Sequence, residues 1–177
     1  VGAYSAFPFG CALEPQAIGT GICGPYRVPH LDYEGIALAT NTYPVGAYRG
    51  VGFPLCPLTM EGLLDRVAAA TGTDPAEVRR RNLITASELP MRNPVGALYD
   101  SGDFPKLLGL AIDRIEYDEF RQRQRTQSPV RLRKGIGISS FIEFSATNNE
   151  MFKRRGIPHI PGFDSALVRV RPDGKIE

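Results

Sequence analysis

Two consecutive helices with clear boundaries constrain this chain more than any other feature. The first is expected over 57–71, where apolar residues recur at helical spacing, and Gly72 follows as its C-terminal stop. The second opens with Asp74 as N-cap and Pro75 at the first helical position, a combination that favours a helix start. It is expected to end near Leu83. The pattern therefore predicts two helices with a short break between them.

Weaker patterns predict three more helices. A short one is expected near 14–19, and Asp103 can cap another over 104–115. A polar helix with few apolar positions is expected over 117–127, and such a helix usually depends on a neighbour for stability. The buried stripe of the capped helix is expected to consist of Leu107, Leu108, Ala111 and Ile115.

Several short stretches favour strands. They comprise an extended piece at 1–5, short strands at 26–29 and 32–40, a β segment at 134–144, and a C-terminal hairpin in which a turn at 172–174 follows a strand at 166–170. Loops are expected over 89–100 and 148–163. The composite predicts an α+β fold, with several helices packed on short, mostly antiparallel or mixed strands. No linker divides residues 1–177, so a single unit is expected.

Composition excludes several classes of protein. A net charge of +2 gives no argument for nucleic acid, and no apolar run is long enough to span a membrane. The three cysteines are too few and too widely spaced for a disulfide framework or a zinc site, and no signal peptide is visible. A cytoplasmic, reducing location is therefore expected. The hairpin that stops in its second arm is taken to mean that the parent polypeptide continues.

A glycine-rich loop over 41–54 is the candidate binding element. Three glycines surround Arg49 between an apolar run and a helix, and such a loop can hold an anionic ligand through its backbone and its cation. The alternative is a tight turn with a solvated arginine, and spacing alone favours that alternative.

The loop is one of several motifs along the chain that together resemble one enzyme family. It is similar to a loop in the large, molybdenum-binding subunit of the xanthine dehydrogenase, aldehyde oxidase and carbon monoxide dehydrogenase family. Further matches lie on both sides of it in the same order: Gly24-Pro25-Tyr26-Arg27-Val28-Pro29, Glu61 with Asp65, Asp74-Pro75 with Glu77, Arg79 and Arg81-Asn82-Leu83-Ile84, Tyr99-Asp100-Ser101-Gly102-Asp103-Phe104, and Gly135-Ile136-Gly137-Ile138 followed by Glu143.

The resemblance implies part of a molybdenum hydroxylase that oxidises an aldehyde or an N-heterocycle. In that family a molybdopterin, often its cytosine dinucleotide, carries the metal. Hydroxide on molybdenum attacks carbon, and a hydride passes to a sulfido ligand. Electrons leave through 2Fe–2S clusters and FAD on partner subunits or domains. The expected partners are the remainder of the large subunit, the iron–sulfur and FAD subunits, and a second copy in a homodimeric assembly.

The same resemblance assigns the site residues. Arg49 matches the arginine beside the molybdenum oxygens and is the catalytic candidate, because a permanently charged guanidinium can stabilise oxo groups. The residues expected to contact the cofactor are Tyr48, Arg49, Gly50, Val51 and Gly52. No protein ligand to the metal is expected. The alternative for Tyr48 is a core aromatic. Glu143 is less secure as a site residue, and its alternative is a solvated or salt-bridged carboxylate.

Departures from the family pattern limit what is expected. Gly50 replaces the cysteine of copper-type carbon monoxide enzymes, and Val51 replaces the phenylalanine of purine enzymes. The family usually has a proline–glutamate pair just after the loop, whereas this chain has Cys56 in that region. A cysteine at the start of a helix is more often a small buried apolar residue than a reactive one. The family's catalytic G-x-G-E motif does not occur, so these 177 residues alone are not expected to be catalytic. A non-catalytic structural or interaction domain of the same fold is the alternative.

Overall fold

The computed structural model describes residues 2–4, 13–44, 46–126, 134–145, 153 and 165–177. The chain forms two compact units, Val1–Glu143 and Phe144–Glu177. All helices and strands with defined bounds belong to the first unit. They are α1 (Leu13–Gly21), α2 (Leu55–Thr71), α3 (Pro75–Asn82), the 3-10 helix η1 (Ala86–Glu88), β1 (Met91–Arg92), β2 (Leu98–Tyr99), α4 (Phe104–Arg114) and α5 (Tyr117–Thr126).

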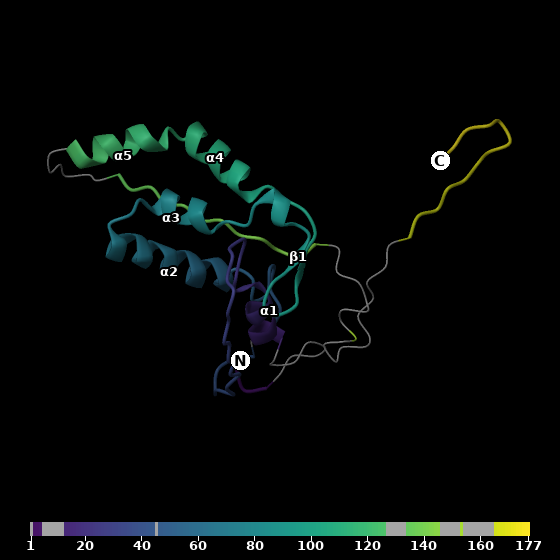
Figure 1. Ribbon diagram of the computed structural model, residues 1–177. Helices are drawn as coiled ribbons and strands as arrows, with labels where there is room; N and C mark the ends of the chain where they lie inside the picture. Colours follow the sequence, from purple (N-terminus) through teal and green to yellow (C-terminus); the bar gives the residue numbers. More distant parts are fainter. Residues whose placement is uncertain (1, 5–12, 45, 127–133, 146–152, 154–164) are drawn as a thin grey trace. The chain divides into compact units, whose positions relative to one another are not determined.

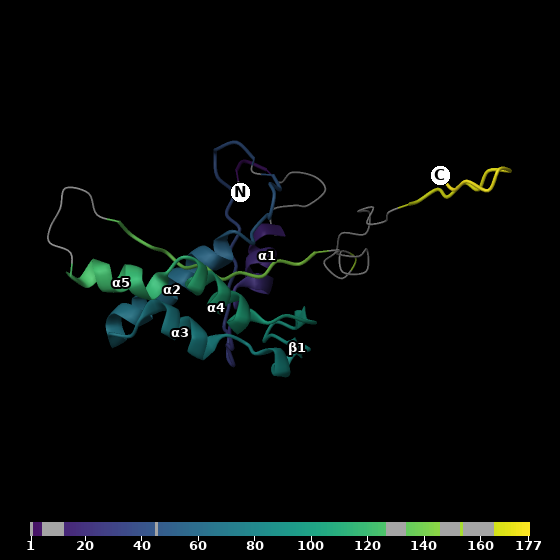
Figure 2. The same ribbon diagram turned by 90° about the horizontal axis from the view of Figure 1, so that it is seen from above.

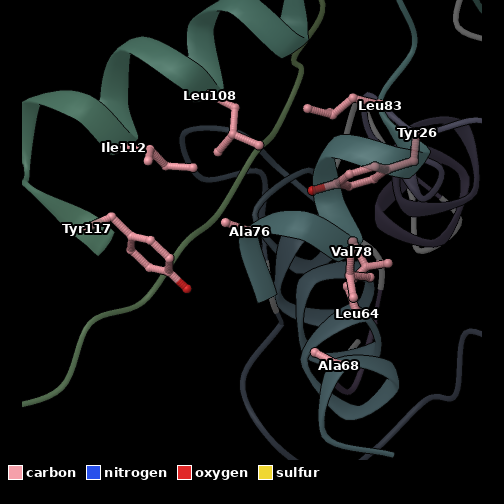
Figure 3. Close-up of a cluster of buried hydrophobic side chains, with 9 residues drawn as sticks. All are labelled: Tyr26, Leu64, Ala68, Ala76, Val78, Leu83, Leu108, Ile112 and Tyr117. Carbon is pink, nitrogen blue, oxygen red and sulfur yellow. The ribbon is translucent and has the colours of Figure 1, made fainter. Parts of the chain in front are cut away.

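Helix α3 lies between α2 on one side and the consecutive helices α4 and α5 on the other (Figures 1 and 2). The buried cluster draws on all four helices and on the segment before α2, and Figure 3 shows its members. They are Tyr26, Leu64, Ala68, Ala76, Val78, Leu83, Leu108, Ile112 and Tyr117. Helices and a small antiparallel sheet together confirm the α+β class, although helix–helix packing forms the core.

The predicted break between the two central helices is confirmed, although α2 begins at Leu55 and not at 57. Gly72 takes the left-handed conformation at φ 65° and its N–H donates to the Ala68 carbonyl, which closes α2. The Asp74 carboxylate accepts from the Ala76 N–H at 2.8 Å and so caps α3, with Pro75 in the first turn. The two helices contact each other directly.

The predicted buried stripe of α4 is only partly right. Leu108 and Ile112 are buried, whereas Leu107 and Ile115 are 68% and 47% exposed and Ala111 is also exposed. Positions 108 and 112 are one helical turn apart, so they face the core together while 107 and 111 point away. Spacing located the helix but did not select the face that packs.

Two predicted strands do not form ladders in the described residues. The expected strand at 32–40 has only isolated backbone hydrogen bonds, such as Thr40 N–H to the Gly2 carbonyl at 2.9 Å. The expected β segment at 134–144 has no strand partner among the described residues. Tyr26 forms a single bridge with Leu83 where a short strand was expected. Of the segments 32–40 and 134–144, only Ile136 and Ile138 pack against the core, and residues 32–40 are almost all exposed.

A small hairpin lies where a loop was expected. β1 and β2 pair antiparallel, with Met91 opposite Tyr99 and Arg92 opposite Leu98. The connection is closed by Asn93, whose carboxamide oxygen accepts from the Ala97 N–H at 2.8 Å, and Gly96 takes φ 84° there.

The second unit contains the predicted C-terminal hairpin. Arg169 and Glu177 exchange backbone hydrogen bonds of 3.0 Å in both directions, and Val170 bridges Ile176. Almost all of the expected loop at 148–163 lies outside the described residues, and so do residues 1 and 5 of the expected extended piece at 1–5, whose described residues 2–4 form no strand. None of the described helices has the length and apolarity that a membrane span requires.

Candidate functional site

The arginine loop winds directly into α2 through a series of tight turns. The Val51 N–H donates to the Tyr48 carbonyl at 2.6 Å, and the Phe53 N–H donates to the Gly50 carbonyl at 2.9 Å. The Leu55 N–H then donates to the Gly52 carbonyl at 3.1 Å, at the start of the helix. The loop backbone is therefore internally bonded around the position of Arg49 and is continuous with a helix.

Two adjacent residues at the tip of the loop have positive φ angles. Gly50 has φ 87°, which costs glycine little, whereas Val51 has φ 51°, which is a real outlier for a β-branched residue. Such conformations cost about 1–3 kcal/mol and persist where the surroundings enforce them, often at functional sites. The positive φ of Val51 therefore indicates that the surroundings of the loop impose the conformation of this turn.

Gly52 fixes the loop against α1. A Cβ atom at this position would lie 2.5 Å from the Glu14 carbonyl oxygen and 2.8 Å from Ile18 Cγ1. Both distances are far below van der Waals contact, so only glycine allows the backbone to come this close. The loop is thus anchored on α1 two residues after Gly50.

Helix α1 offers the same close approach on two further sides. A Cβ at Gly21 would meet the Phe53 ring at 2.7 Å, and a Cβ at Gly19 would meet the Tyr33 ring at 2.7 Å. The Tyr33 hydroxyl also donates to the Pro15 carbonyl at 2.9 Å. The glycines of α1 therefore let both the arginine loop and the segment around Tyr33 lie directly on the helix backbone.

Arg49 and Tyr48 project from this anchored loop into solvent. Tyr48 is 85% exposed and Arg49 is also exposed. Within the part of the chain that the structure describes, the Arg49 guanidinium has no hydrogen bond or ion pair. Tyr48 is therefore not a core aromatic in this chain. An unpaired guanidinium on an anchored loop is available to an anionic group.

Glu143 lies beside the loop although it is distant in sequence. A Cβ on Gly50 would lie 3.8 Å from Glu143 Oε1, so the carboxylate lies beside the residue that follows Arg49. Glu143 is exposed and, among the described residues, has neither an ion pair nor a hydrogen bond. The structure thus brings together a predicted site residue and a carboxylate whose role the sequence left open.

A buried polar network holds the segment that carries Glu143. Arg79 is fully buried, and its Nε donates to Glu61 Oε2 at 2.7 Å while the Tyr26 hydroxyl donates to Glu61 Oε1 at 2.5 Å. Arg79 Nη2 also lies 2.9 Å from Asp65 Oδ1 and donates to the Ile138 carbonyl at 3.0 Å. Burial, reinforced by Glu61, raises the pKa of Tyr26 well above its usual range.

The same segment also packs on the apolar core. Ile136 and Ile138 lie against the buried cluster, and a Cβ on Gly24 would lie 4.0 Å from the Ser140 carbonyl oxygen. The segment runs past α3 toward α1 (Figure 1). These contacts fix the path of residues 136–140 and so determine where Glu143 emerges.

The cysteine next to the loop has a buried thiol of low reactivity. Cys56 is 4% exposed, and its thiol contacts the Ile18 carbonyl oxygen at 3.5 Å. Burial raises the pKa of the Cys56 thiol to about 11, so it is protonated near neutral pH. Cys23 is likewise buried and free. These properties are those of a small apolar side chain that fills space beneath the loop.

Comparison with known proteins decides the family. Residues 1–83 match the model of the molybdopterin cofactor-binding domain. The chain is 32% identical to the nicotine 6-hydroxylase large subunit of Paenarthrobacter nicotinovorans, over 99% of this chain and 21% of that protein. The chain belongs to the family of molybdenum-binding large subunits. The carbon monoxide dehydrogenase large chain of Afipia carboxidovorans is 30% identical over 95% of this chain and 22% of its own length.

A solved structure has the same fold over this region. Quinoline 2-oxidoreductase from Pseudomonas putida aligns with a TM-score of 0.80 and 32% identity, over 99% of this chain and 22% of the solved chain. The chain thus spans about a fifth of the length of the relatives that it matches. The resemblance inferred from the ordered motifs is therefore confirmed at the level of family and fold.

The residues of the loop fit an anionic cofactor group. The described residues contain no group of three or more histidines, cysteines, aspartates or glutamates that could hold a metal. The loop instead offers an unpaired guanidinium and an open backbone, because a Cβ on Gly46 would meet nothing within 4 Å. Sequence reasoning missed the glycines of α1 as the support of this loop, although their number within one helix was a usable indication.

Proposed function

We propose that this chain contributes one side of a molybdopterin-dependent hydroxylase centre, in which residues 48–52 contact the cofactor and Arg49 is the catalytic cation. The observation that carries the proposal is the unpaired, exposed guanidinium on a loop anchored by Gly52 to α1. Membership of the molybdenum-binding large-subunit family supports it. The cofactor, when bound, supplies the redox chemistry of an oxidative hydroxylation.

The roles of the loop residues follow from their chemistry. Arg49 presents several N–H donors and a permanent charge, which bind anionic oxygens and stabilise negative charge as it develops. Gly50 allows close approach because it has no side chain, and the positive φ of Val51 indicates that the surroundings impose one conformation on this turn. Tyr48 provides an exposed aromatic surface that can cover an aromatic substrate.

The wider assembly belongs to the same proposal. The substrate class is an aldehyde or an N-heterocycle, and the names of the relatives, a nicotine hydroxylase and a quinoline oxidoreductase, favour the heterocycle. The cofactor is proposed to be the cytosine dinucleotide form, with 2Fe–2S clusters and FAD on partner subunits of a cytoplasmic, homodimeric complex. A relative named as one subunit of a dehydrogenase complex supports partner subunits.

The test is an Arg49→Ala variant in the full-length subunit, compared with Arg123→Ala on the exposed face of α5. Loss of one donor that stabilises developing charge typically lowers kcat by about 10²–10³-fold. We expect a loss of that size for Arg49→Ala and none for Arg123→Ala, with molybdenum and pterin contents measured in both. Full activity of Arg49→Ala would remove Arg49 from the mechanism, and absence of both molybdenum and pterin from the wild type would reject the proposed function.

A further inference from the structure

We propose that Glu143 is a substrate-binding carboxylate, and that it recognises a protonated amine on an N-heterocyclic substrate at the edge of the arginine loop. This inference rests on the proposed function, because it assigns the substrate side of the same site. Its starting point is the juxtaposition of Glu143 Oε1 with Gly50, at 3.8 Å from the position that a Cβ would occupy.

The carboxylate is available for a ligand. Among described residues it forms no ion pair or hydrogen bond, although Arg49 is the neighbour of Gly50 in the chain. If these two charges served only the fold, a direct ion pair between them would be the simplest arrangement, and none lies within 4.0 Å. Arg49 and Glu143 are therefore two separate charged groups on one loop region, each open to a different partner.

Buried contacts of the residues that precede Glu143 set its position. Arg79 donates to the Ile138 carbonyl at 3.0 Å, and Ile136 and Ile138 pack on the core. Only four residues separate Ile138, whose carbonyl is fixed, from Glu143, so the chain passes from a buried support to the loop over residues 139–143. A binding group held in this way needs little ordering when a ligand arrives, which favours affinity.

The chemistry of Glu143 and its neighbours determines which kind of ligand the site would bind. A carboxylate binds ammonium and N–H donors through charge-assisted hydrogen bonds, and an exposed tyrosine such as Tyr48 attracts cations to its ring face. Arg49 alone would repel a cation, but direct contact with Glu143 outweighs a more distant like charge because Coulomb energy falls with distance. An anionic cofactor beside Arg49 would reduce that repulsion further.

The experiment compares two probes that differ only in the charged group. 3-(Aminomethyl)pyridine carries a protonated amine near neutral pH, and 3-methylpyridine is its neutral counterpart. Dissociation constants for both are measured by calorimetry on the full-length holoenzyme, together with KM and kcat for oxidation. We expect the wild type to bind the charged probe about tenfold or more tightly, as one hydrogen bond to a charged group allows.

Glu143→Gln should remove that preference, while the affinity for the neutral 3-methylpyridine stays near that of the wild type. Glu143→Asp, which keeps the charge, should retain part of the preference, and Glu119→Gln on α5 should change nothing. The proposal is wrong if the wild type has no preference, if Glu143→Gln keeps it, or if both Glu143 variants weaken both probes equally, as a purely structural role would require. Failure of the proposed function is distinguishable, because it would appear as a wild type without cofactor or with no dependence on Arg49.

Discussion

Arg79 Nη2 donates a 3.0 Å hydrogen bond to the carbonyl oxygen of Ile138, so a guanidinium with no solvent exposure joins α3 to the extended segment that ends at Glu143. The same guanidinium is bonded to Glu61 on α2 at 2.7 Å. One buried side chain therefore ties two helices to a segment that has no strand partner. The position of the carboxylate at the loop depends on this connection.

We predict that Arg79→Met lowers the free energy of unfolding by about 3–5 kcal/mol, because it leaves the Glu61 carboxylate buried without its cation. The double variant Arg79→Met/Glu61→Leu should recover much of the loss, since no uncompensated charge remains. Urea denaturation followed by circular dichroism measures both. Arg81→Ala, which removes an exposed ion pair with Glu77, is the control and should change stability by less than about 1 kcal/mol. A double variant as unstable as Arg79→Met would contradict this account.

Alanine substitution of two glycines in the same loop should affect stability differently. Gly52→Ala would place a Cβ 2.5 Å from the Glu14 carbonyl oxygen, so overpacking should cost about 1–3 kcal/mol and displace the loop from α1. Gly46→Ala meets nothing within 4 Å and should leave the melting temperature nearly unchanged. Differential scanning calorimetry of both variants makes the comparison. Equal melting temperatures for the two would show that the loop does not rest on α1.

The thiol beneath the loop gives a prediction at alkaline pH. Burial raises the pKa of Cys56 from 9.0 in the unfolded chain to about 11, so the folded state holds this proton more tightly. The resulting stability is fully present below pH 9 and is lost as the pH rises through about 11. Cys56→Ala should therefore show a shallower decline of the urea midpoint between pH 9 and 11 than the wild type. Rapid alkylation of native Cys56 by iodoacetamide at pH 8 would count against a buried, protonated thiol.

An acidic transition should depend on Glu88. Hydrogen bonds from Thr85 first, and then the Arg27 guanidinium, lower the pKa of Glu88 from 4.5 to about 2. This stabilisation is present above pH 4.5 and is lost as the pH falls through about 2. Glu88→Gln should flatten the dependence of stability on pH in that window, whereas Glu119→Gln should not. Acid titrations of the denaturation midpoint compare the variants, and identical curves for Glu88→Gln and wild type would refute the assignment.

The sequence predicted the helices well because their ends depend on local chemistry. Asp74 caps α3 through its own carboxylate, and Gly72 closes α2 by adopting a conformation that glycine favours. Strands need partners, and sequence spacing does not identify partners. The apolar pattern at Ile136 and Ile138 was therefore interpreted as a β segment, although these side chains pack on helices.

Only the part of the site that is contiguous in sequence could be predicted. Residues 48–52 are contiguous, so a motif locates them together, and their cofactor contacts remain a prediction. The approach of Glu143 to Gly50 depends on the buried bonds of Arg79 and could not be read from spacing. The short hairpin of β1 and β2 was missed because each strand has only two residues, too few to show alternation.

The glycines of α1 have a consequence for efforts to engineer this protein. Alanine is the residue that most favours a helix, and a stabilisation campaign guided by propensity would replace Gly19 and Gly21 first. Each replacement would push an aromatic ring, that of Tyr33 or Phe53, away from the helix axis. Such overpacking costs stability, so the helix propensity gained by alanine would be offset by the lost fit on α1, and Gly21→Ala would also shift the segment that carries Arg49.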